Sequence, residues 1–157
     1  MKIILLTVGK TDINWVREGL ETYSSRLLHY APFCLTEIPE LKNTSALTKE
    51  QIKVKEGELI LKNIKPTDRV ILLDERGKEY RSVEFADEIR RMTAGGGKDI
   101  VFVIGGAYGF SEDVYARSNG KMSLSRMTFS HQMVRTIFTE QLYRAFTIIK
   151  GEPYHHE

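Results

Sequence analysis

Short apolar runs that alternate with helical patterns constrain the fold of this chain more than any other feature of its sequence. Four runs are rich in apolar and β-branched residues, and a fifth, Met-Ser-Leu-Ser, alternates with a period of two. These runs span residues 2–8, 33–38, 69–73, 99–104 and 122–125. Between and after them, apolar residues recur at spacings of three and four, which is typical of helices. The alternation predicts an α/β fold, with a mostly parallel sheet and helices on both of its faces.

The last helical pattern is the longest, and it places one wide apolar stripe between Met133 and Ile149. Ser130 is expected to cap its start, because a serine oxygen accepts from the unpaired amides of a first turn. Gly151 and Pro153 are expected to end it, since glycine permits a left-handed turn and proline lacks an amide donor. A short polar and aromatic tail follows.

Length and composition are those of an ordinary globular protein, with 157 residues, 41% hydrophobic content and a formal charge of +2. We expect a single domain spanning residues 1–157. No apolar run reaches the roughly 20 residues that span a bilayer, and the apolar start (residues 1–8) has no signal cleavage site. One cysteine, Cys34, cannot form an internal disulfide, which fits a reducing compartment. The sequence therefore predicts a cytoplasmic protein without a membrane segment.

Ligands of parallel α/β folds bind beyond the carboxyl ends of the strands. Three strand-end loops combine this position with glycine or with mixed polar and apolar residues. They follow Leu73, Ile104 and Ser125. The second half of the chain is therefore predicted to carry the site.

Common cofactor and metal motifs do not occur. The glycines at 105–109 do not form the GxGxxG fingerprint, and no Walker lysine follows them. The pattern favours a tight strand-to-helix turn there. His155 and His156 are adjacent, His29 and His131 are scattered, and none has the spacing of a metal site. No Ser-His-Asp arrangement or paired carboxylate stands out either, so motifs alone assign no chemistry.

Several segments, taken in order, carry a resemblance over the whole chain. They are LLDERGK at 72–78, VIGGAYGF at 103–110, EQLYRA at 140–145 and YHHE at 154–157, with LTVGK at 6–10 and EIP at 37–39. Together they resemble the ribosomal RNA large subunit methyltransferase H family, of the SPOUT class. One departure is Ala107, where this family often has proline. A methyl group there leaves the backbone contacts of the loop possible.

The resemblance implies an α/β fold whose carboxyl-terminal part forms a trefoil knot, in an obligate homodimer. It implies S-adenosylmethionine as methyl donor, no metal, and methylation at N3 of a pseudouridine in 23S rRNA of the assembled ribosome. Two other functions remain open from the residues. One is a SPOUT enzyme acting on another RNA such as tRNA, and the other is a non-catalytic α/β module that binds RNA or a nucleotide.

Carried over position by position, the family's cofactor loops fall on the three strand ends already singled out. The implied cofactor-binding residues are Leu72, Leu73, Gly105, Gly106, Leu124, Ser125, Arg126, Met127, Thr128 and Phe129. S-adenosylmethionine has no phosphate, so backbone groups and apolar walls suffice to hold it. Leu73, Leu124, Met127 and Phe129 are expected to supply those walls.

The implied reaction is an in-line attack of N3 on the sulfonium methyl, after the imide N3–H has lost its proton. His131, Tyr154 and His155 are expected to assist deprotonation or hold the base. Arg144 would face the RNA backbone or stabilise the imide anion. Two simpler roles compete: Arg144 pairs with Glu140 along the helix, and His131 only helps the helix start. A site shared between two subunits is a further hypothesis.

Overall fold

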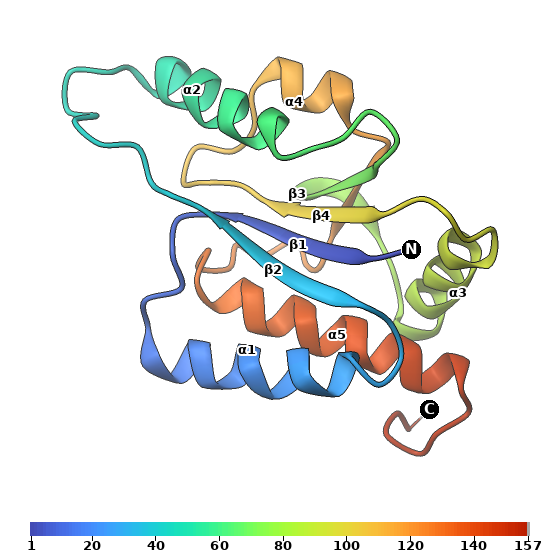
Figure 1. The fold of residues 1–157 in the computed structure, drawn as a ribbon. Helices are drawn as coiled ribbons and strands as arrows, with labels where there is room; N and C mark the ends of the chain where they lie inside the picture. The colour runs from blue at the N-terminus through green and yellow to red at the C-terminus, as the bar shows by residue number, and fades with distance from the viewer. Residues whose placement is uncertain (157) are drawn as a thin grey trace.

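The computed structural model describes residues 1–156 and contains a five-stranded parallel sheet (Figure 1). In sequence order the strands are β1 (Ile3–Val8), β2 (Phe33–Ile38), β3 (Arg69–Glu79), β4 (Ile100–Ile104) and β5 (Gly120–Ser123). Across the sheet the order is β2-β1-β4-β3-β5, and every pairing of neighbours is parallel. The predicted parallel sheet is confirmed.

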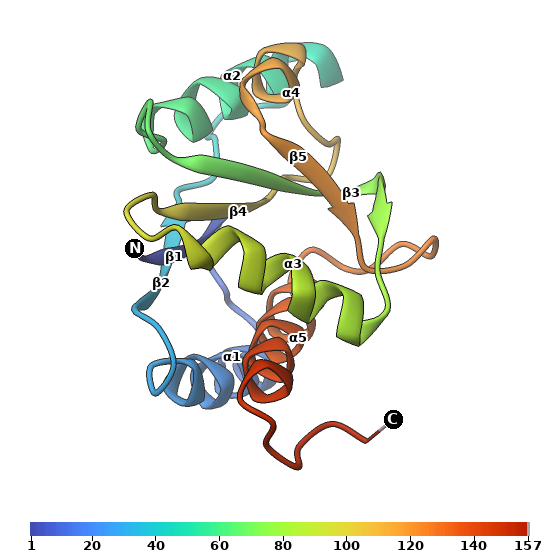
Figure 2. The ribbon, with the colours of Figure 1, turned by 90° about the vertical axis from the view of Figure 1, so that its right-hand side faces the viewer.

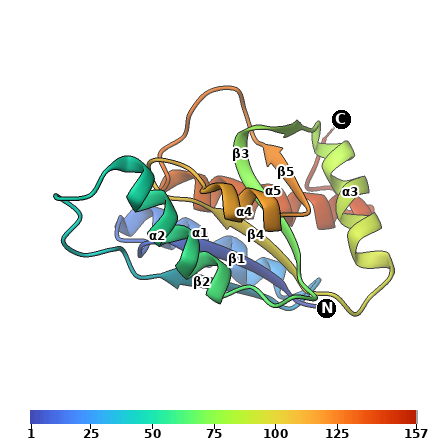
Figure 3. The same cartoon turned by 90° about the horizontal axis from the view of Figure 1, so that it is seen from above.

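Helices cover both faces of this sheet, as the alternating pattern predicts (Figures 1 and 2). They are α1 (Asn14–Leu27), α2 (Lys49–Lys62), α3 (Ser82–Ala94), α4 (Glu112–Arg117) and α5 (Met133–Ile149). Helices α1, α3 and α5 pack on one face, whereas α2 and α4 lie over the other, which is the near side when the molecule is seen from above (Figure 3). The result is a three-layer arrangement.

Two apolar cores fill the spaces on either side of the sheet. One contains Phe102 with Phe138 of α5, and the other contains Val101 and Val103 with Ile60 of α2. Successive side chains of a strand point to opposite faces. Every residue of β4 is therefore buried, and its sequence IVFVI is apolar throughout.

The strand order brings three carboxyl ends together. β4 lies between β1 and β3, and β3 lies between β4 and β5. Because all the strands run in the same direction, the loops that follow β4 and β5 leave from the same edge of the sheet, beside the stretch of β3 that follows Leu73. This is the edge at which parallel α/β folds bind ligands.

Strand β3 is longer than the sequence predicts, because it continues through polar residues to Glu79. β5 pairs with it on both sides of a register shift, so Met122 lies opposite Leu73 and again opposite Lys78. Gly77 lies in the shifted stretch, where a Cβ would come within 2.5 Å of the backbone of Met122. The predicted polar loop is therefore wrong here: this stretch is a crossing of two backbones that requires glycine.

Side-chain capping explains where two helices begin. Thr48 and Gln51 form a capping box at the start of α2, with Thr48 Oγ1 accepting from Gln51 N–H at 3.1 Å and Gln51 Oε1 accepting from Thr48 N–H at 2.8 Å. Before α5, Ser130 Oγ accepts from the N–H groups of Gln132 and Met133, at 3.2 and 3.3 Å. Ser130 thus satisfies one amide of the first turn, although the N-cap residue is Gln132.

Candidate cofactor and active site

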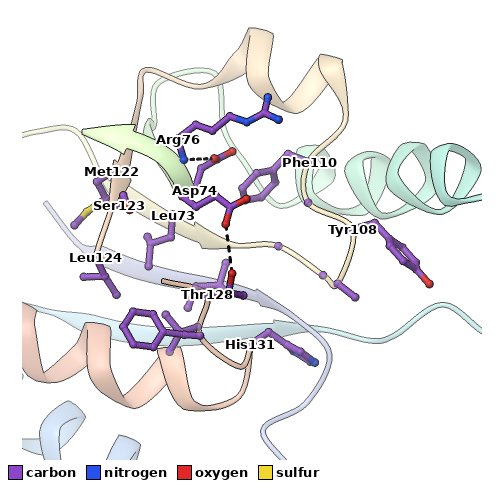
Figure 4. A pocket seen from close by; sticks show the side chains of 18 of the residues that line it. Leu73, Asp74, Arg76, Tyr108, Phe110, Met122, Ser123, Leu124, Thr128 and His131 are labelled. Atoms are coloured by element: carbon purple, nitrogen blue, oxygen red, sulfur yellow. Dashed lines mark hydrogen bonds between the residues drawn. The ribbon is translucent and has the colours of Figure 1, made fainter. Parts of the chain in front are cut away.

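A cavity of about 630 Å³ opens at the carboxyl ends of β4 and β5, beside residues 73–76 of β3 (Figure 4). Its volume is within the roughly 300–1,000 Å³ that is usual for small-molecule sites. The walls come from the three strand-end loops that the sequence singles out, with a few residues of α2, α4 and α5. They comprise residues 73–76, 104–110, 122–125 and 127–131, together with Lys53, Tyr115 and Val134.

The loop after β4 packs closely against two side chains. A Cβ on Gly105 would come within 3.0 Å of the Phe110 ring, and one on Gly106 within 2.6 Å of the Glu56 carboxylate. Gly109 has a φ of 84°, in the left-handed region that favours glycine. Glycine is thus needed for the turn itself. Because glycine has no side chain, the loop also presents its backbone groups to the cavity.

The loop after β5 is shaped by its own serines. Ser123 Oγ donates to the Ser125 carbonyl at 2.8 Å, and Ser125 Oγ accepts from Met127 N–H at 3.0 Å. Leu124 is half-buried, but Met127 is 78% exposed and Phe129 is 37% exposed. These side chains give the cavity apolar walls that solvent still reaches.

The stretch of β3 that follows Leu73 is fixed by a half-buried carboxylate. Asp74 Oδ1 accepts from Arg76 N–H at 2.8 Å, and Asp74 Oδ2 accepts from the Tyr115 hydroxyl. Burial, followed by this hydrogen bond, raises the pKa of Tyr115 to about 12, so its hydroxyl stays protonated and donates at neutral pH. Thr128 Oγ1 donates to a Glu75 carboxylate oxygen at 3.5 Å, which links this stretch to the loop after β5 (Figure 4).

His131 lies at the cavity, immediately before α5. Its Nδ1 is buried and has no hydrogen-bond partner among residues 1–156. Its carbonyl accepts from Arg135 Nε at 3.0 Å, and Arg135 in turn donates to the carbonyls of Val8 and Gly9 at 3.0 and 2.9 Å. The backbone of His131 is therefore held to the end of β1, while Nδ1 of its ring is enclosed without a partner among the described residues.

The other three predicted catalytic residues form a cluster at the far end of α5. Arg144 Nη2 donates to Glu140 Oε1 at 2.5 Å, Arg144 Nη1 lies 3.1 Å from His155 Nδ1, and the Tyr154 hydroxyl donates to Glu140 Oε1 at 3.0 Å. The Arg144 guanidinium also lies over the Tyr154 ring, 4.8 Å from its centroid. Burial, then hydrogen bonding to Tyr23 and Glu140, raises the pKa of Tyr154. The helical Glu140–Arg144 pair that the spacing suggests is present.

These two groups do not meet within one chain. At 1.5 Å per residue, His131 and Arg144 are separated by about 20 Å along α5. Arg144, Tyr154 and His155 do not line the cavity that His131 lines. The last residue of the predicted tail, Glu157, lies outside the described residues.

Most of the predicted cofactor residues do meet at the cavity. The ones that line it are Leu73, Gly105, Gly106, Leu124, Ser125, Met127, Thr128 and Phe129. Leu72 does not, because strand side chains alternate and its side chain is fully buried in the core under α2 and α4. Arg126 is exposed and is not part of the walls. Cofactor binding by these two residues stays a prediction.

Residues 1–155 match the family described as "Predicted SPOUT methyltransferase". The chain belongs to the SPOUT methyltransferase family. It is 52% identical to the "Ribosomal RNA large subunit methyltransferase H" of Parabacteroides distasonis over 157 residues, which is 100% of both chains. It is 54% identical to the protein of the same name from Flavobacterium psychrophilum, again over 100% of both.

A solved structure of low sequence identity has the same fold. It is described as "a probable methylase family protein from Haemophilus influenzae Rd KW20" and superposes with a TM-score of 0.54 at 12% identity. The superposition covers 99% of this chain and 70% of that one. At this identity the likeness concerns the fold alone, and it supports the layered α/β architecture of a SPOUT chain.

Sequence reasoning missed two residues that shape this SPOUT site. Asp74 stands directly after a predicted strand, so the strand-end rule was a usable signal for it. Tyr115 carried no such signal, because α4 reaches the cavity only through tertiary packing.

Among residues 1–156 no group of three His, Cys, Asp or Glu side chains is placed to hold a metal ion. In the same part of the chain, no helix has the length and apolarity needed to cross a membrane.

Proposed function

We propose that this protein transfers a methyl group from S-adenosylmethionine to N3 of a pseudouridine in 23S rRNA of the assembled ribosome. One observation carries the proposal. A cavity of about 630 Å³ lies at the strand ends of a SPOUT chain that matches, over its full length, proteins named ribosomal RNA large subunit methyltransferase H. The protein would act in the cytoplasm, as one domain spanning residues 1–157.

The walls of the cavity fit S-adenosylmethionine, which supplies an electrophilic methyl group when bound. Leu73, Leu124 and Ile104 are apolar and suit the adenine and the sulfonium-bearing chain. Gly105 and Gly106 present backbone amides and carbonyls, which recognise the edge of a purine without a side-chain motif. The cofactor has no phosphate, so the absence of a phosphate-binding fingerprint agrees with this assignment. No metal is needed for the transfer.

The target nitrogen must lose its imide proton before it attacks the methyl group. His131 lines the cavity, so its imidazole is placed to take or hold that proton. Tyr154 has a raised pKa and keeps its own proton at neutral pH. It would therefore hold the base by donating a hydrogen bond. Arg144 would stabilise the anionic imide.

A homodimer would bring the two groups of residues together. The separation of about 20 Å along α5 is too large for one chain to place His131 and Arg144 on one nucleotide. We therefore expect the tail of one subunit to serve the cavity of its partner, with His131 from one chain and Arg144, Tyr154 and His155 from the other.

Mixing inactive subunits tests this sharing. A His131→Ala chain and an Arg144→Ala chain, each inactive alone, form mixed dimers in which one of the two sites is intact. With random pairing in a two-fold dimer, activity should return to about a quarter of the wild-type value. No recovery in a verified mixed dimer would assign each site to one chain.

We also propose that the carboxyl-terminal part is threaded as a trefoil knot. The support is the close crossing at which the backbone of Met122 passes Gly77, with β5 paired to both halves of β3. Pulling the two termini apart in an optical trap tests this. A tightened knot leaves the unfolded chain shorter than 157 extended residues, and the full contour length would exclude a knot.

Methyl transfer is the decisive measurement for the function as a whole. Labelled S-adenosylmethionine is offered with intact ribosomes, free 23S rRNA and tRNA, and the digested RNA is analysed for N3-methylpseudouridine by mass spectrometry. We expect label in the ribosomes and little in the free RNAs. Label in tRNA would indicate another RNA target. The absence of both transfer and calorimetric binding of S-adenosylmethionine would leave a non-catalytic RNA- or nucleotide-binding module.

A further inference from the structure

The root of the carboxyl-terminal tail is tied to a distant part of the chain. Gly151 turns the backbone after α5 with a φ of 69°, and Glu152 N–H donates to the Thr147 carbonyl at 2.9 Å. The Glu152 carboxylate then accepts a hydrogen bond from the hydroxyl of Tyr30, at 2.6 Å, across 122 positions of sequence. Tyr30 lies in the turn that follows α1, so this contact joins the carboxyl-terminal tail to the end of α1.

The ring of Tyr30 is itself firmly placed. It stacks on Phe146 of α5, with centroids 5.8 Å apart and an interplanar angle of 17°, and it meets the edge of Tyr143 at 6.1 Å. Tyr143 in turn packs against Tyr154 at 4.7 Å. A continuous row of aromatic rings thus connects Tyr30 with the tail. The hydroxyl of Tyr30 is a fixed point from which the tail leaves the helix.

The backbone between this fixed point and the tail groups is stiff. Pro153 follows Glu152, its ring locks its own φ, and it restricts the conformation of the residue before it. The direction in which Tyr154 and His155 leave is therefore largely set by the position of Glu152. A carboxylate held at 2.6 Å sets that position more narrowly than a free one would.

We propose that Tyr30, acting through Glu152, is a positioning residue for the tail groups Tyr154 and His155 during methyl transfer. The proposal rests on the function proposed above, because it concerns the delivery of the tail to the target nucleotide. Tyr30 itself touches neither the cavity nor the tail groups' polar atoms. The hydrogen bond to Glu152 also raises the pKa of Tyr30 to about 12, so this hydroxyl remains a donor at neutral pH.

Tyr30→Phe is the sharpest test, because it keeps the stacked ring and removes the hydroxyl alone. We expect kcat for ribosome methylation to fall about three- to ten-fold, which corresponds to the loss of one solvent-exposed hydrogen bond of ordinary strength. The affinity for S-adenosylmethionine and the urea midpoint should stay at wild-type values. Glu152→Ala should lower kcat equally, whereas Glu152→Gln, which keeps an accepting oxygen, should recover most of it. The double variant Tyr30→Phe, Glu152→Ala should be no worse than either single variant.

The control is Tyr80→Phe, which removes a hydroxyl that has no hydrogen-bond partner among residues 1–156 and should leave kcat unchanged. A wild-type kcat in Tyr30→Phe, or additive losses in the double variant, would overturn the positioning role.

Hydrogen exchange separates this proposal from the proposed function. The Glu152 amide, bonded to Thr147, should exchange faster in Tyr30→Phe than in the wild type, whatever the enzyme methylates. Unchanged exchange would show that Tyr30 does not order the tail. A different result would be faster exchange in Tyr30→Phe together with no RNA methylation by the wild type. It would refute the proposed methyltransferase function, and with it the expected effect of Tyr30 on kcat.

Discussion

Arg135 is the side chain whose removal tests the architecture of this site most directly. It is fully buried, and it donates to the carbonyls of Val8 and Gly9 at 3.0 and 2.9 Å and to Thr11 Oγ1 at 2.8 Å. The carboxylate of Glu37 lies 3.5 Å away. Burial lowers the pKa of Arg135, and Glu37 partly opposes this shift. One guanidinium thereby joins the ends of β1 and β2 to the start of α5.

Arg135→Met keeps much of the side-chain volume but removes all of these donors. Each buried acceptor left without a partner costs about 1–3 kcal/mol, whereas the ion pair with the partly exposed Glu37 contributes at most about 1 kcal/mol. Methionine restores part of the loss through apolar packing. We therefore expect the free energy of unfolding to fall by about 3–5 kcal/mol, a large share of the roughly 5–15 kcal/mol that is typical of a domain.

Urea unfolding followed by circular dichroism measures this change. The matched control is Arg91→Met, because Arg91 is exposed on α3 and pairs with the neighbouring Glu88. In Arg91→Met the free energy of unfolding should fall by less than about 1 kcal/mol. S-adenosylmethionine should also bind more weakly to Arg135→Met, since the carbonyl of His131 loses its donor. A loss below about 1 kcal/mol in Arg135→Met would refute the view that this guanidinium holds the site together.

Three further changes test separate parts of the structure. Gly77→Ala should lower the free energy of unfolding by about 1–3 kcal/mol, because the new methyl group meets the Met122 backbone, whereas Gly95→Ala, with nothing within 4 Å of its Cβ position, should be nearly neutral in the same urea assay. The raised pKa of Tyr115, about 12, means that its contribution to stability is fully present below about pH 10 and is lost as the pH rises through 12. The phenolate absorbance of the wild type and of Tyr115→Phe is titrated with pH, and the difference between the two curves should be centred near pH 12. A difference centred near pH 10 would contradict the raised pKa. His131→Ala should lower kcat for methyl transfer about 100-fold or more with little change in calorimetric affinity for S-adenosylmethionine, and an unchanged kcat would remove His131 from the chemistry.

The layered fold could be predicted because its signals are local. The five residues of β4 are all apolar and all buried, and the Thr48–Gln51 capping box lies where the sequence places it. Such signals depend on side chains within a few positions of each other. The loops after β4 and β5 could be predicted for the same reason, once the strands were expected to run parallel.

Predictions from local sequence patterns failed where contacts with a distant segment determine burial or strand length. Arg135 stands in an amphipathic pattern, and a charged residue there would ordinarily face solvent, but the end of β1 supplies carbonyls that need a donor. β3 continues through polar residues because β5 pairs with them after the register shift at Gly77. Leu72 and Leu73 are the same residue type, yet side chains alternate along the strand, so Leu72 lies in the core and Leu73 lines the cavity.

By itself, the sequence determined the order of strands and helices, the edge of the sheet at which the cavity opens, and many of the residues that line the cavity. The tertiary structure decided which side chains are excluded from the walls, and that Arg144, Tyr154 and His155 lie about 20 Å along α5 from His131. The physical reason is the distance along the chain between the residues that interact. Periodicity and capping depend on neighbours along the chain, whereas contacts such as Tyr30–Glu152, 122 positions apart, exist only after the layers have packed.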